Sequence, residues 1–497
     1  MDLLYKSTRN NELTVTASEA ILKGLAEDGG LFVPVEIPKL GISMEQLKDM
    51  SYQETAYEVM KEFFTDFSEE ELKSCIEKAY DSKFDTEEIA PLVKADGNYY
   101  LELFHGATIA FKDMALSVLP HLLITSAKKN HVKNEIVILT ATSGDTGKAA
   151  LSGFADVEGT RIIVFYPKNG VSKVQELQMV TQKGDNTAVV AIHGNFDEAQ
   201  SGVKAIFENK ELGKWMQEKG FQFSSANSIN IGRLVPQIVY YVYAYAKLLQ
   251  NEEIVVGEEI NVTVPTGNFG NILAAYYAKQ MGVPIAKLIC ASNENKVLFD
   301  FFETGTYDRN REFILTTSPS MDILISSNLE RLVYLITGQD ADQTSDLMCA
   351  LKSQGVYEID ESMKNLLHDF SAGYATEQQV KEQIRKLYEK TGYVVDTHTA
   401  VAAYVSDAYK KNTGDTRKMV IASTASPFKF VKSVMTAIDE ETYKEKDEFT
   451  LVEELQAVSC TDIPKAVKDL NHAPILHTRE CDPESMEEMV KKILNIN

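Results

Sequence analysis

The stretch that decides the fold is Phe104-His105-Gly106-Ala107-Thr108-Ile109-Ala110-Phe111-Lys112-Asp113. Aromatic and aliphatic residues at 99–103 predict a strand before it, and apolar residues at helical spacing over 114–119 predict a helix after it. A lysine at such a junction can be partly desolvated between an aromatic ring and the backbone. Burial favours the neutral amine, which is the form that adds to an aldehyde. A lysine without these surroundings is far more often an ordinary surface lysine at a helix start.

Short apolar strands alternate with helices beyond this junction. Strands are predicted over residues 135–139, 161–166, 188–192, 260–264, 287–291 and 419–422. Helices are predicted from about Gly147, over 272–275 and over 234–249, and the last of these is expected to be buried. Alternation of this kind is typical of an α/β fold with parallel, doubly wound sheets.

The same patterns divide the chain into four parts. We predict a mostly helical N-terminal region over 1–95, an α/β domain with Lys112 over 96–260, a second α/β domain over 261–435, and a C-terminal extension over 436–497. In the first part, Ser18 is the predicted N-cap of a helix that ends at Asp28-Gly29-Gly30. Capping boxes are predicted at Ser43 with Gln46, Ser51 with Glu54, Ser68 with Glu71 and Thr376 with Gln379.

The charge balance excludes some classes of partner. The 497 residues include 73 acidic and 50 basic side chains, which leaves a net charge of −23. Repulsion at long range therefore disfavours nucleic acid and anionic membranes. An anionic small substrate would need a local cluster of hydrogen-bond donors that acts against the overall field.

Cysteine usage points to a reducing compartment. The five cysteines are far apart and form no C-x-x-C pair, so neither a disulfide framework nor a zinc site is expected; they are Cys75, Cys290, Cys349, Cys460 and Cys481. The N-terminus lacks the pattern of a signal peptide, and no apolar run has the length of a membrane span. We therefore predict a cytoplasmic protein without a metal site.

A glycine-rich turn follows the strand that ends at Val264, and its sequence is Thr266-Gly267-Asn268-Phe269-Gly270-Asn271. Backbone N–H groups in such a turn can bind an anion, and the dipole of the following helix adds to the attraction. Spacing alone does not separate an anion site from an ordinary strand-to-helix turn.

A second turn of this kind has the sequence Ala141-Thr142-Ser143-Gly144-Asp145-Thr146-Gly147-Lys148. A nucleotide P-loop would need glycine in place of Thr142 and a hydroxyl residue in place of Ala149, so nucleotide hydrolysis is excluded. Hydroxyl and backbone N–H groups at a helix start suit a carboxylate or a phosphate ester.

A third segment, 423–430, follows the last predicted strand. Without its surroundings, Thr424 in this segment would be interpreted as a helix cap.

These runs together resemble the threonine synthases, and the resemblance extends from about Tyr5 to the C-terminal region. It implies that Lys112 is catalytic and holds pyridoxal 5'-phosphate as a Schiff base. It places the cofactor phosphate at 267–271 and the pyridine nitrogen at Thr424, whose neutral hydroxyl would make the ring a mild electron sink. The implied cofactor-binding residues are Lys112, Gly267, Asn268, Phe269, Gly270, Asn271 and Thr424, and the implied substrate-binding residues are Ser143, Gly144, Asp145, Thr146 and Arg233.

The resemblance further implies two α/β domains of the type II fold of pyridoxal-phosphate enzymes, with the cofactor in the cleft between them. The implied reaction converts O-phospho-L-homoserine and water into L-threonine and phosphate by γ-elimination and β-hydration, the last step of threonine biosynthesis. The freed Lys112 amine would act as general acid and base. The resemblance leaves open which loop holds the substrate carboxylate, and whether the protein is a monomer or a homodimer.

Two positions depart from the family pattern. Ala107 replaces the usual proline, which is expected only to loosen the approach to Lys112, and Ser426 stands where relatives often have histidine. One rival hypothesis is another phospho-amino-acid lyase of the same fold, which eliminates phosphate without adding water. A second is a non-catalytic binding protein on the same scaffold, although Lys112 and Thr424 are both retained.

Overall fold

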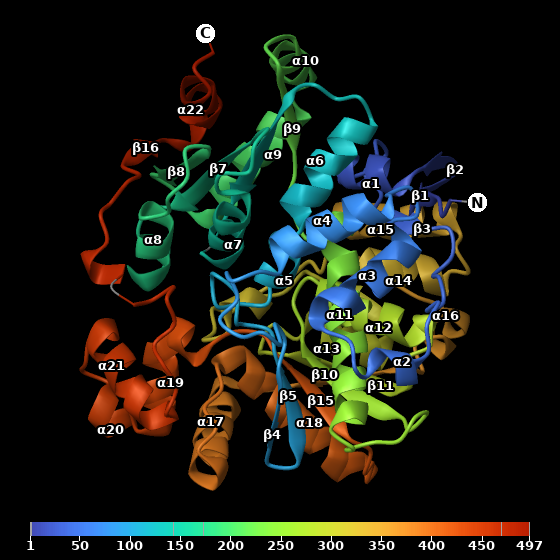
Figure 1. Ribbon diagram of the computed structural model, residues 1–497, viewed down its shortest axis with the longest axis vertical. Helices are drawn as coiled ribbons and strands as arrows, with labels where there is room; N and C mark the ends of the chain where they lie inside the picture. Colours follow the sequence, from blue (N-terminus) through green and yellow to red (C-terminus); the bar gives the residue numbers. More distant parts are fainter. Residues whose placement is uncertain (1, 143, 172, 469, 497) are drawn as a thin grey trace.

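Two mostly parallel sheets organise the chain, which the computed structural model describes over residues 2–142, 144–171, 173–468 and 470–496. The five-stranded sheet lies in the upper part of Figure 1, and its strands pair in parallel in the order β16-β8-β7-β6-β9. Its strands are β6 (Glu135–Ala141), β7 (Thr160–Pro167), β8 (Thr187–Ile192), β9 (Phe221–Ser224) and β16 (Arg479–Cys481).

The six-stranded sheet has the order β14-β11-β10-β15-β5-β4 and is parallel apart from the antiparallel pair of β4 and β5. Its strands are β4 (Leu92–Ala95), β5 (Asn98–Glu102), β10 (Ile260–Pro265), β11 (Ile285–Ser292), β14 (Phe370–Tyr374) and β15 (Met419–Ser423). The six strands predicted between 135 and 422 are all confirmed.

Both sheets are buried on both faces. On β6, Ile136 and Ile138 belong to the main hydrophobic core, whereas Val137 and Leu139 belong to a second core beneath α9 (Phe196–Glu208), α10 (Lys210–Glu218) and α22 (Met486–Ile493). On β15, Val420 and Ile421 likewise face different cores. Successive side chains of a strand point to opposite faces, so helices must cover both sides. This arrangement confirms the predicted doubly wound α/β fold.

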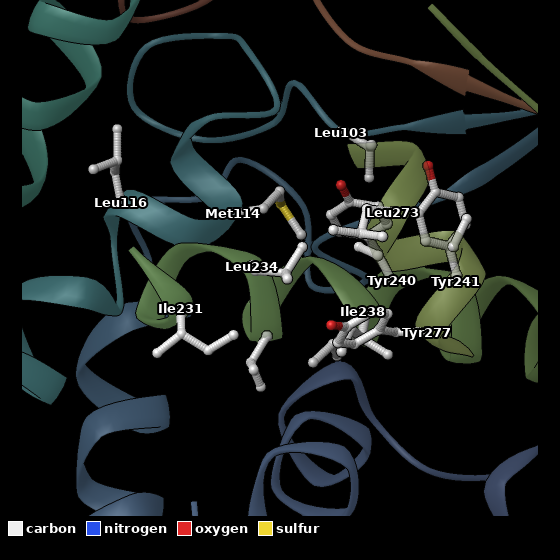
Figure 2. Packing of buried hydrophobic residues seen from close by; sticks show 14 of the residues in the cluster. Leu103, Met114, Leu116, Ile231, Leu234, Ile238, Tyr240, Tyr241, Leu273 and Tyr277 are labelled. Carbon is white, nitrogen blue, oxygen red and sulfur yellow. The ribbon is translucent and has the colours of Figure 1, made fainter. Parts of the chain in front are cut away.

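The long helix α11 (Ile231–Gln250) is the centre of the main core and confirms the buried helix predicted over 234–249. It packs against α3 (Tyr52–Phe63), α5 (Asp113–Leu116) and α12 (Gly270–Met281). Figure 2 shows side chains of α11 between those of α5 and α12; the labelled residues are Leu103, Met114, Leu116, Ile231, Leu234, Ile238, Tyr240, Tyr241, Leu273 and Tyr277. One helix thus supports both the lysine junction and the turn at 266–271.

The N-terminal region consists of β1 (Tyr5–Ser7), β2 (Asn10–Val15), β3 (Phe32–Pro34), α1 (Ala17–Lys23), α2 (Met44–Leu47), α3 and α4 (Glu69–Ala79). The four predicted capping boxes are confirmed. Ser18 is not the N-cap of α1, because Thr16 and Glu19 form a capping box two residues earlier. The helix also ends before 28–30, at Gly24, where φ is 70°.

The remaining elements surround the two sheets. They are α6 (Leu119–Lys129), α7 (Asp145–Phe154), α8 (Lys173–Val180), α13 (Val297–Thr304), β12 (Thr306–Asp308), η1 (Pro319–Met321), α14 (Leu329–Ile336), α15 (Ala341–Gln354), β13 (Val356–Glu358), α16 (Glu361–Asn365), α17 (Glu377–Thr391), α18 (Thr397–Thr413), η2 (Pro427–Phe430), α19 (Val431–Ile438), α20 (Glu440–Tyr443), α21 (Glu448–Ser459), η3 (Leu470–His472) and η4 (Pro483–Ser485).

Each of the two sheets contains strands from more than one of the four predicted parts. Strand β5, from the part over 96–260, pairs with β15, and β16, from the C-terminal extension, pairs with β8 (Figure 1). Periodicity predicts a strand but not its partner, so this long-range pairing is absent from the sequence pattern. The four-part division stays a prediction.

The structure also reports on the cysteines, on membrane spans and on metal ligands. All five cysteines are free thiols. Within the described ranges, no helix has the length and apolarity that crossing a membrane requires. Nor do the described His, Cys, Asp and Glu side chains gather in threes as a metal ion would need.

Candidate active site

Three neighbouring strand ends bring the predicted site residues to one edge of the six-stranded sheet. Strands β10, β15 and β5 are adjacent and parallel, so their carboxyl ends lie side by side. The chain continues from these ends into the turn at 266–271, into Thr424 and into the run 104–113. Ligands of open α/β sheets bind at this kind of edge.

The run 104–113 is attached to the segment that follows β15. The Phe111 N–H donates to the Thr424 carbonyl at 2.8 Å, and the Ser426 N–H donates to the Ile109 carbonyl at 3.0 Å. Ile109 has a φ of 53°, a left-handed conformation that strains a β-branched residue. Ser426, at the position where relatives often have histidine, uses its hydroxyl to cap η2 by accepting the Phe428 N–H at 3.3 Å.

Lys112 lies at the start of α5, and its side chain is 12% exposed. Its Nζ donates to the Ser320 hydroxyl at 3.2 Å and lies 3.6 Å from Oδ2 of Asp145. Burial lowers the pKa of Lys112; Asp145 opposes this effect, while the positive charges of Lys429 and Arg233 add to it. The amine is therefore desolvated, as the junction predicted.

Asp145 gathers polar groups from several elements around one carboxylate. The Ser320 hydroxyl donates to its Oδ2 at 2.8 Å, the Gln175 amide donates to its Oδ1 at 2.9 Å, and Lys429 Nζ lies 3.3 Å from Oδ1. Burial would raise the pKa of Asp145, but Lys429, Lys112 and His398 outweigh it and hold that pKa far below its usual range. The Asp145 side chain thus binds cationic groups and does not itself suit an anionic substrate.

The 143–146 turn contains three further residues that are predicted to bind substrate: Ser143, Gly144 and Thr146. Gly144 and Thr146 flank Asp145 at the start of α7. Ser143 lies outside the described residues.

The segment between β12 and α14 contacts both Lys112 and the turn at 266–271. Ser326 donates its hydroxyl to the Gly267 carbonyl at 2.7 Å, and the Asn328 N–H donates to the Asn268 carbonyl at 3.0 Å. The Ser320 carbonyl packs so tightly on Gly267 that a Cβ there would lie 2.5 Å from the oxygen. Ser320 consequently touches both Lys112 and the glycine turn.

His398 holds this segment in place from α18. The Ser320 N–H donates to Nε2 of His398 at 3.1 Å, and Nδ1 of the ring lies 2.6 Å from Oδ2 of Asp396. Because Nε2 accepts a hydrogen bond, the ring proton is on Nδ1 and is donated to the carboxylate.

The turn at 266–271 offers donors at the N-terminus of α12. Phe269 has a φ of 65°, and its buried ring stacks on Phe302 with centroids 6.1 Å apart. The Oδ1 atom of Asn271 accepts hydrogen bonds from Tyr240, at 2.8 Å, and from Tyr241. These bonds fix the amide so that Nδ2 is the free end, and this buried Nδ2 has no hydrogen-bond partner among the residues that the structure describes.

Arg233, near the start of α11, is 3% exposed. One guanidinium nitrogen donates to the Ala226 carbonyl at 2.9 Å, but Nε has no partner within the described part of the chain. Burial lowers the pKa of Arg233 to about 10, so the group stays charged at neutral pH. A buried guanidinium with an unused N–H is suited to an anion.

A pocket of about 680 Å³ opens on the other side of the lysine run, among α4, α6 and α7. Ala107, at the position where relatives have proline, lines this pocket together with Asp113 and His121. None of the residues predicted to bind the cofactor lines it. The pocket is therefore separate from the strand-end site.

Family models match most of the chain. Residues 4–80 match the family described as "Threonine synthase N terminus", residues 86–424 match "Pyridoxal-phosphate dependent enzyme", and residues 399–475 match "Threonine synthase, C-terminal". The threonine synthase of Saccharomyces cerevisiae is 33% identical over 517 aligned positions, which cover 98% of each chain. The chain belongs to the threonine synthase family.

Two further comparisons agree with membership of the threonine synthase family. The solved structure of a PLP-bound threonine synthase from Brucella melitensis superposes with a TM-score of 0.87 at 34% identity and covers 99% of both chains. Human "Threonine synthase-like 1" is 41% identical over 434 residues, which are 85% of this chain. The match spans 58% of the length of that relative.

Sequence reasoning missed three residues of this family member's site, namely Ser320, His398 and Lys429. The signals were weak but present. Lys429 lies between two phenylalanines, Phe428 and Phe430, which is an unusual place for an exposed lysine. His398 follows Asp396 at a spacing that allows an Asp–His pair, and Ser320 follows a proline that begins a turn.

Proposed function

We propose that this protein binds pyridoxal 5'-phosphate on Lys112 and converts O-phospho-L-homoserine and water into L-threonine and phosphate. The observation that carries the proposal is the desolvated amine of Lys112, 3.6 Å from the Asp145 carboxylate, at the same sheet edge as the turn at 267–271. Membership of the threonine synthase family supports it, as does the PLP-bound Brucella relative.

The residues present fit this cofactor. Lys112 supplies the amine for the aldehyde. The turn at 267–271 supplies N–H groups at a helix start, a glycine with no room for a side chain, and the unpartnered Nδ2 of Asn271, which together suit a phosphate. Thr424, 5% exposed at the end of β15, supplies a neutral hydroxyl for the ring nitrogen.

When bound, the cofactor delocalises the negative charge that develops on the carbon atoms of the substrate. The Lys112 amine, freed when the substrate amine binds, removes the proton at Cα and, once it has passed that proton on, the proton at Cβ. It returns one proton at Cγ after phosphate has left. Water then adds its hydroxyl at Cβ, and its proton balances the one that Cα regains. The Ser320 and Asp145 contacts keep this amine oriented for each of these transfers.

Two groups of donors are available for the two anionic ends of the substrate. The unpartnered Nε of buried Arg233 suits the substrate phosphate. The backbone N–H groups of Gly144, Asp145 and Thr146 at the start of α7 suit a carboxylate or a phosphate. For Ser143, a role in substrate binding is supported by the family resemblance alone.

Cell location and pathway belong to the same proposal. Five free thiols support a reducing compartment, and we infer that the protein works in the cytoplasm as the last enzyme of threonine biosynthesis. The net charge of −23 supports a small-molecule substrate over nucleic acid.

The test is incubation of the purified holoenzyme with O-phospho-L-homoserine while phosphate and threonine are measured together. Equal amounts of the two products are expected. Phosphate released with 2-oxobutyrate would instead identify a lyase that eliminates without hydration. Release of neither product would favour a non-catalytic binding protein.

A further inference from the structure

A second lysine, Lys429, is buried beside the site and has no role in the reaction just described. Its side chain is 1% exposed, on η2 directly after Thr424 and Ser426. Its Nζ donates to the carbonyl of Thr108 at 3.0 Å and lies 3.3 Å from Oδ1 of Asp145. Lys429 thus connects the lysine run to the first residue of α7.

We propose that Lys429 is a positioning residue that holds the charge of Asp145 and thereby keeps the Lys112 amine neutral. The inference rests on the proposed function, because it concerns the protonation of the amine that the function requires. Lys429 itself contacts neither substrate nor reacting atoms in this account.

Two lysine side chains approach the carboxylate of Asp145. Lys112 approaches Oδ2 of Asp145 at 3.6 Å, while Lys429 approaches Oδ1 at 3.3 Å. Two ammonium groups share the Asp145 carboxylate in a buried place, and burying an uncompensated charge is costly. Asp113 is another buried carboxyl that Lys429 acts on, but burial raises its pKa, so it holds a negative charge less readily than Asp145 does. The less stabilised ammonium group therefore gives up its proton.

The contacts indicate which amine that is. Lys429 has the shorter ion pair and a second acceptor, the Thr108 carbonyl. Lys112 has the longer ion pair, and among the described residues its hydrogen-bond partner is a serine hydroxyl at 3.2 Å. Lys429 is thus the better counter-ion of Asp145, and Lys112 is left as the neutral amine.

The other charges around Lys112 act in the same direction. Asp145 on α7 is the negative group that faces it, while Lys429 on η2 and Arg233 on α11 are positive groups that repel a proton from it. His398 on α18 faces Asp145 as well, but its Nδ1 proton is donated to Asp396. The neutral amine is the form that adds to an aldehyde and that removes a proton from a substrate carbon.

The proposal predicts how Lys112 titrates when Lys429 is changed. The measurement is the pH dependence of acetylation of Lys112 by acetic anhydride, in the full-length protein freed of cofactor and quantified by peptide mass spectrometry. A small lysine derivative in the same solution corrects for the reagent. In the unchanged protein, the midpoint for Lys112 is expected below that of the free lysine derivative, because burial lowers the pKa of Lys112.

Two variants of Lys429 separate charge from packing. Lys429→Met removes the charge, so the Lys112 midpoint should rise by about one pH unit or more. Lys429→Arg keeps the charge and should leave the midpoint within a few tenths of a unit. Lys148→Met is the matched control: Lys148, on α7, is a half-buried lysine whose Nζ donates to Gln182 rather than pairing with Asp145.

Three outcomes would overturn the proposal. One is an unchanged midpoint in Lys429→Met, and another is an equal rise in Lys429→Arg. If Lys429→Met does not fold, the unchanged protein still decides, because a Lys112 midpoint at the free-lysine value contradicts the proposal. Acetylation needs no turnover, so failure here is distinguishable from failure to form threonine.

Discussion

The carbonyl oxygen of Ser320 lies 2.5 Å from the position that a Cβ atom on Gly267 would occupy. The hydroxyl of the same serine lies 3.2 Å from Nζ of Lys112 and donates to Asp145 at 2.8 Å. One residue, held by His398, therefore sets the spacing between the amine and the glycine turn. Several expected outcomes depend on this spacing and on the contacts around it.

Gly267→Ala should weaken cofactor binding by about tenfold or more, since the added methyl group must displace either the turn or the Ser320 carbonyl, and 1.4 kcal/mol of strain is worth a factor of ten. Titration of the variant with pyridoxal phosphate, followed by absorbance, measures the effect. Gly213→Ala is the control, because a Cβ there meets nothing within 4 Å. Equal affinities for the two variants would show that the turn at 267 does not bind the cofactor.

Asn271→Asp should lower cofactor affinity more strongly than Tyr241→Phe. The aspartate still accepts hydrogen bonds from Tyr240 and Tyr241 but replaces the free Nδ2 donor with a negative charge. Beside a phosphate, that change costs about 2 kcal/mol or more, whereas loss of one hydrogen bond costs about 1 kcal/mol. Equilibrium dialysis with the cofactor measures both variants; a tighter complex with the aspartate would contradict the assignment.

The sequence predicted the strands and the site turns because their signals are local. Apolar runs predicted β6, β7, β8, β10, β11 and β15, and glycine spacing marked the turns at 142–147 and 266–271. The resemblance then assigned Lys112 and Thr424, which the structure brings to one sheet edge.

What the sequence did not predict depends on contacts between distant segments. Ser320 lies 208 residues from Lys112 in the chain, and Lys429 lies 321 residues from Thr108. Neither contact produces a periodic pattern in the sequence. The pairing of β16 with β8 was missed for the same reason. The helix errors at Ser18 and at 28–30 have a local cause, because a stronger capping box at Thr16 and an earlier glycine at 24 prevailed.

Stability should fall as pH rises from about 6.5 to about 9. The ring of His105 lies 2.6 Å from Asp85 and 2.9 Å from Glu102. Burial lowers the pKa of His105, but these two carboxylates outweigh it and raise the pKa to about 9, above the unfolded value of about 6.5. The folded state therefore holds the proton more tightly, and its stabilisation is full below pH 6.5 and lost through pH 9.

Urea unfolding across this pH range measures that contribution, which is on the order of 3 kcal/mol. His105→Gln should flatten the decline. His368→Gln, in which the replaced ring is 72% exposed, should keep it. A decline of the same size in His105→Gln would rule out this histidine as its source.

Glu330→Ala should destabilise the protein by about 2 kcal/mol. Its carboxylate accepts hydrogen bonds from the Thr8 hydroxyl, at 2.6 Å, and from Nε and Nη2 of Arg9, at 2.9 and 2.7 Å. These bonds connect the N-terminal strands to α14. Glu69→Ala breaks the exposed pair with Lys73 and should cost much less, because water screens an exposed pair. Thermal unfolding compares the two; equal losses would mean that the contact at Glu330 contributes no more than a surface pair.

The proposed reaction requires that Lys112 holds the cofactor. Two other lysines, Lys429 and Lys148, are also partly or fully buried nearby. Reduction of the holoenzyme with borohydride fixes the pyridoxyl group on its lysine, and peptide mass spectrometry then locates it. We predict the label on Lys112, and we predict that Lys112→Ala loses both the label and the visible absorption of the bound cofactor. A pyridoxyl group on Lys429 or Lys148, or an unchanged spectrum in Lys112→Ala, would contradict the central claim.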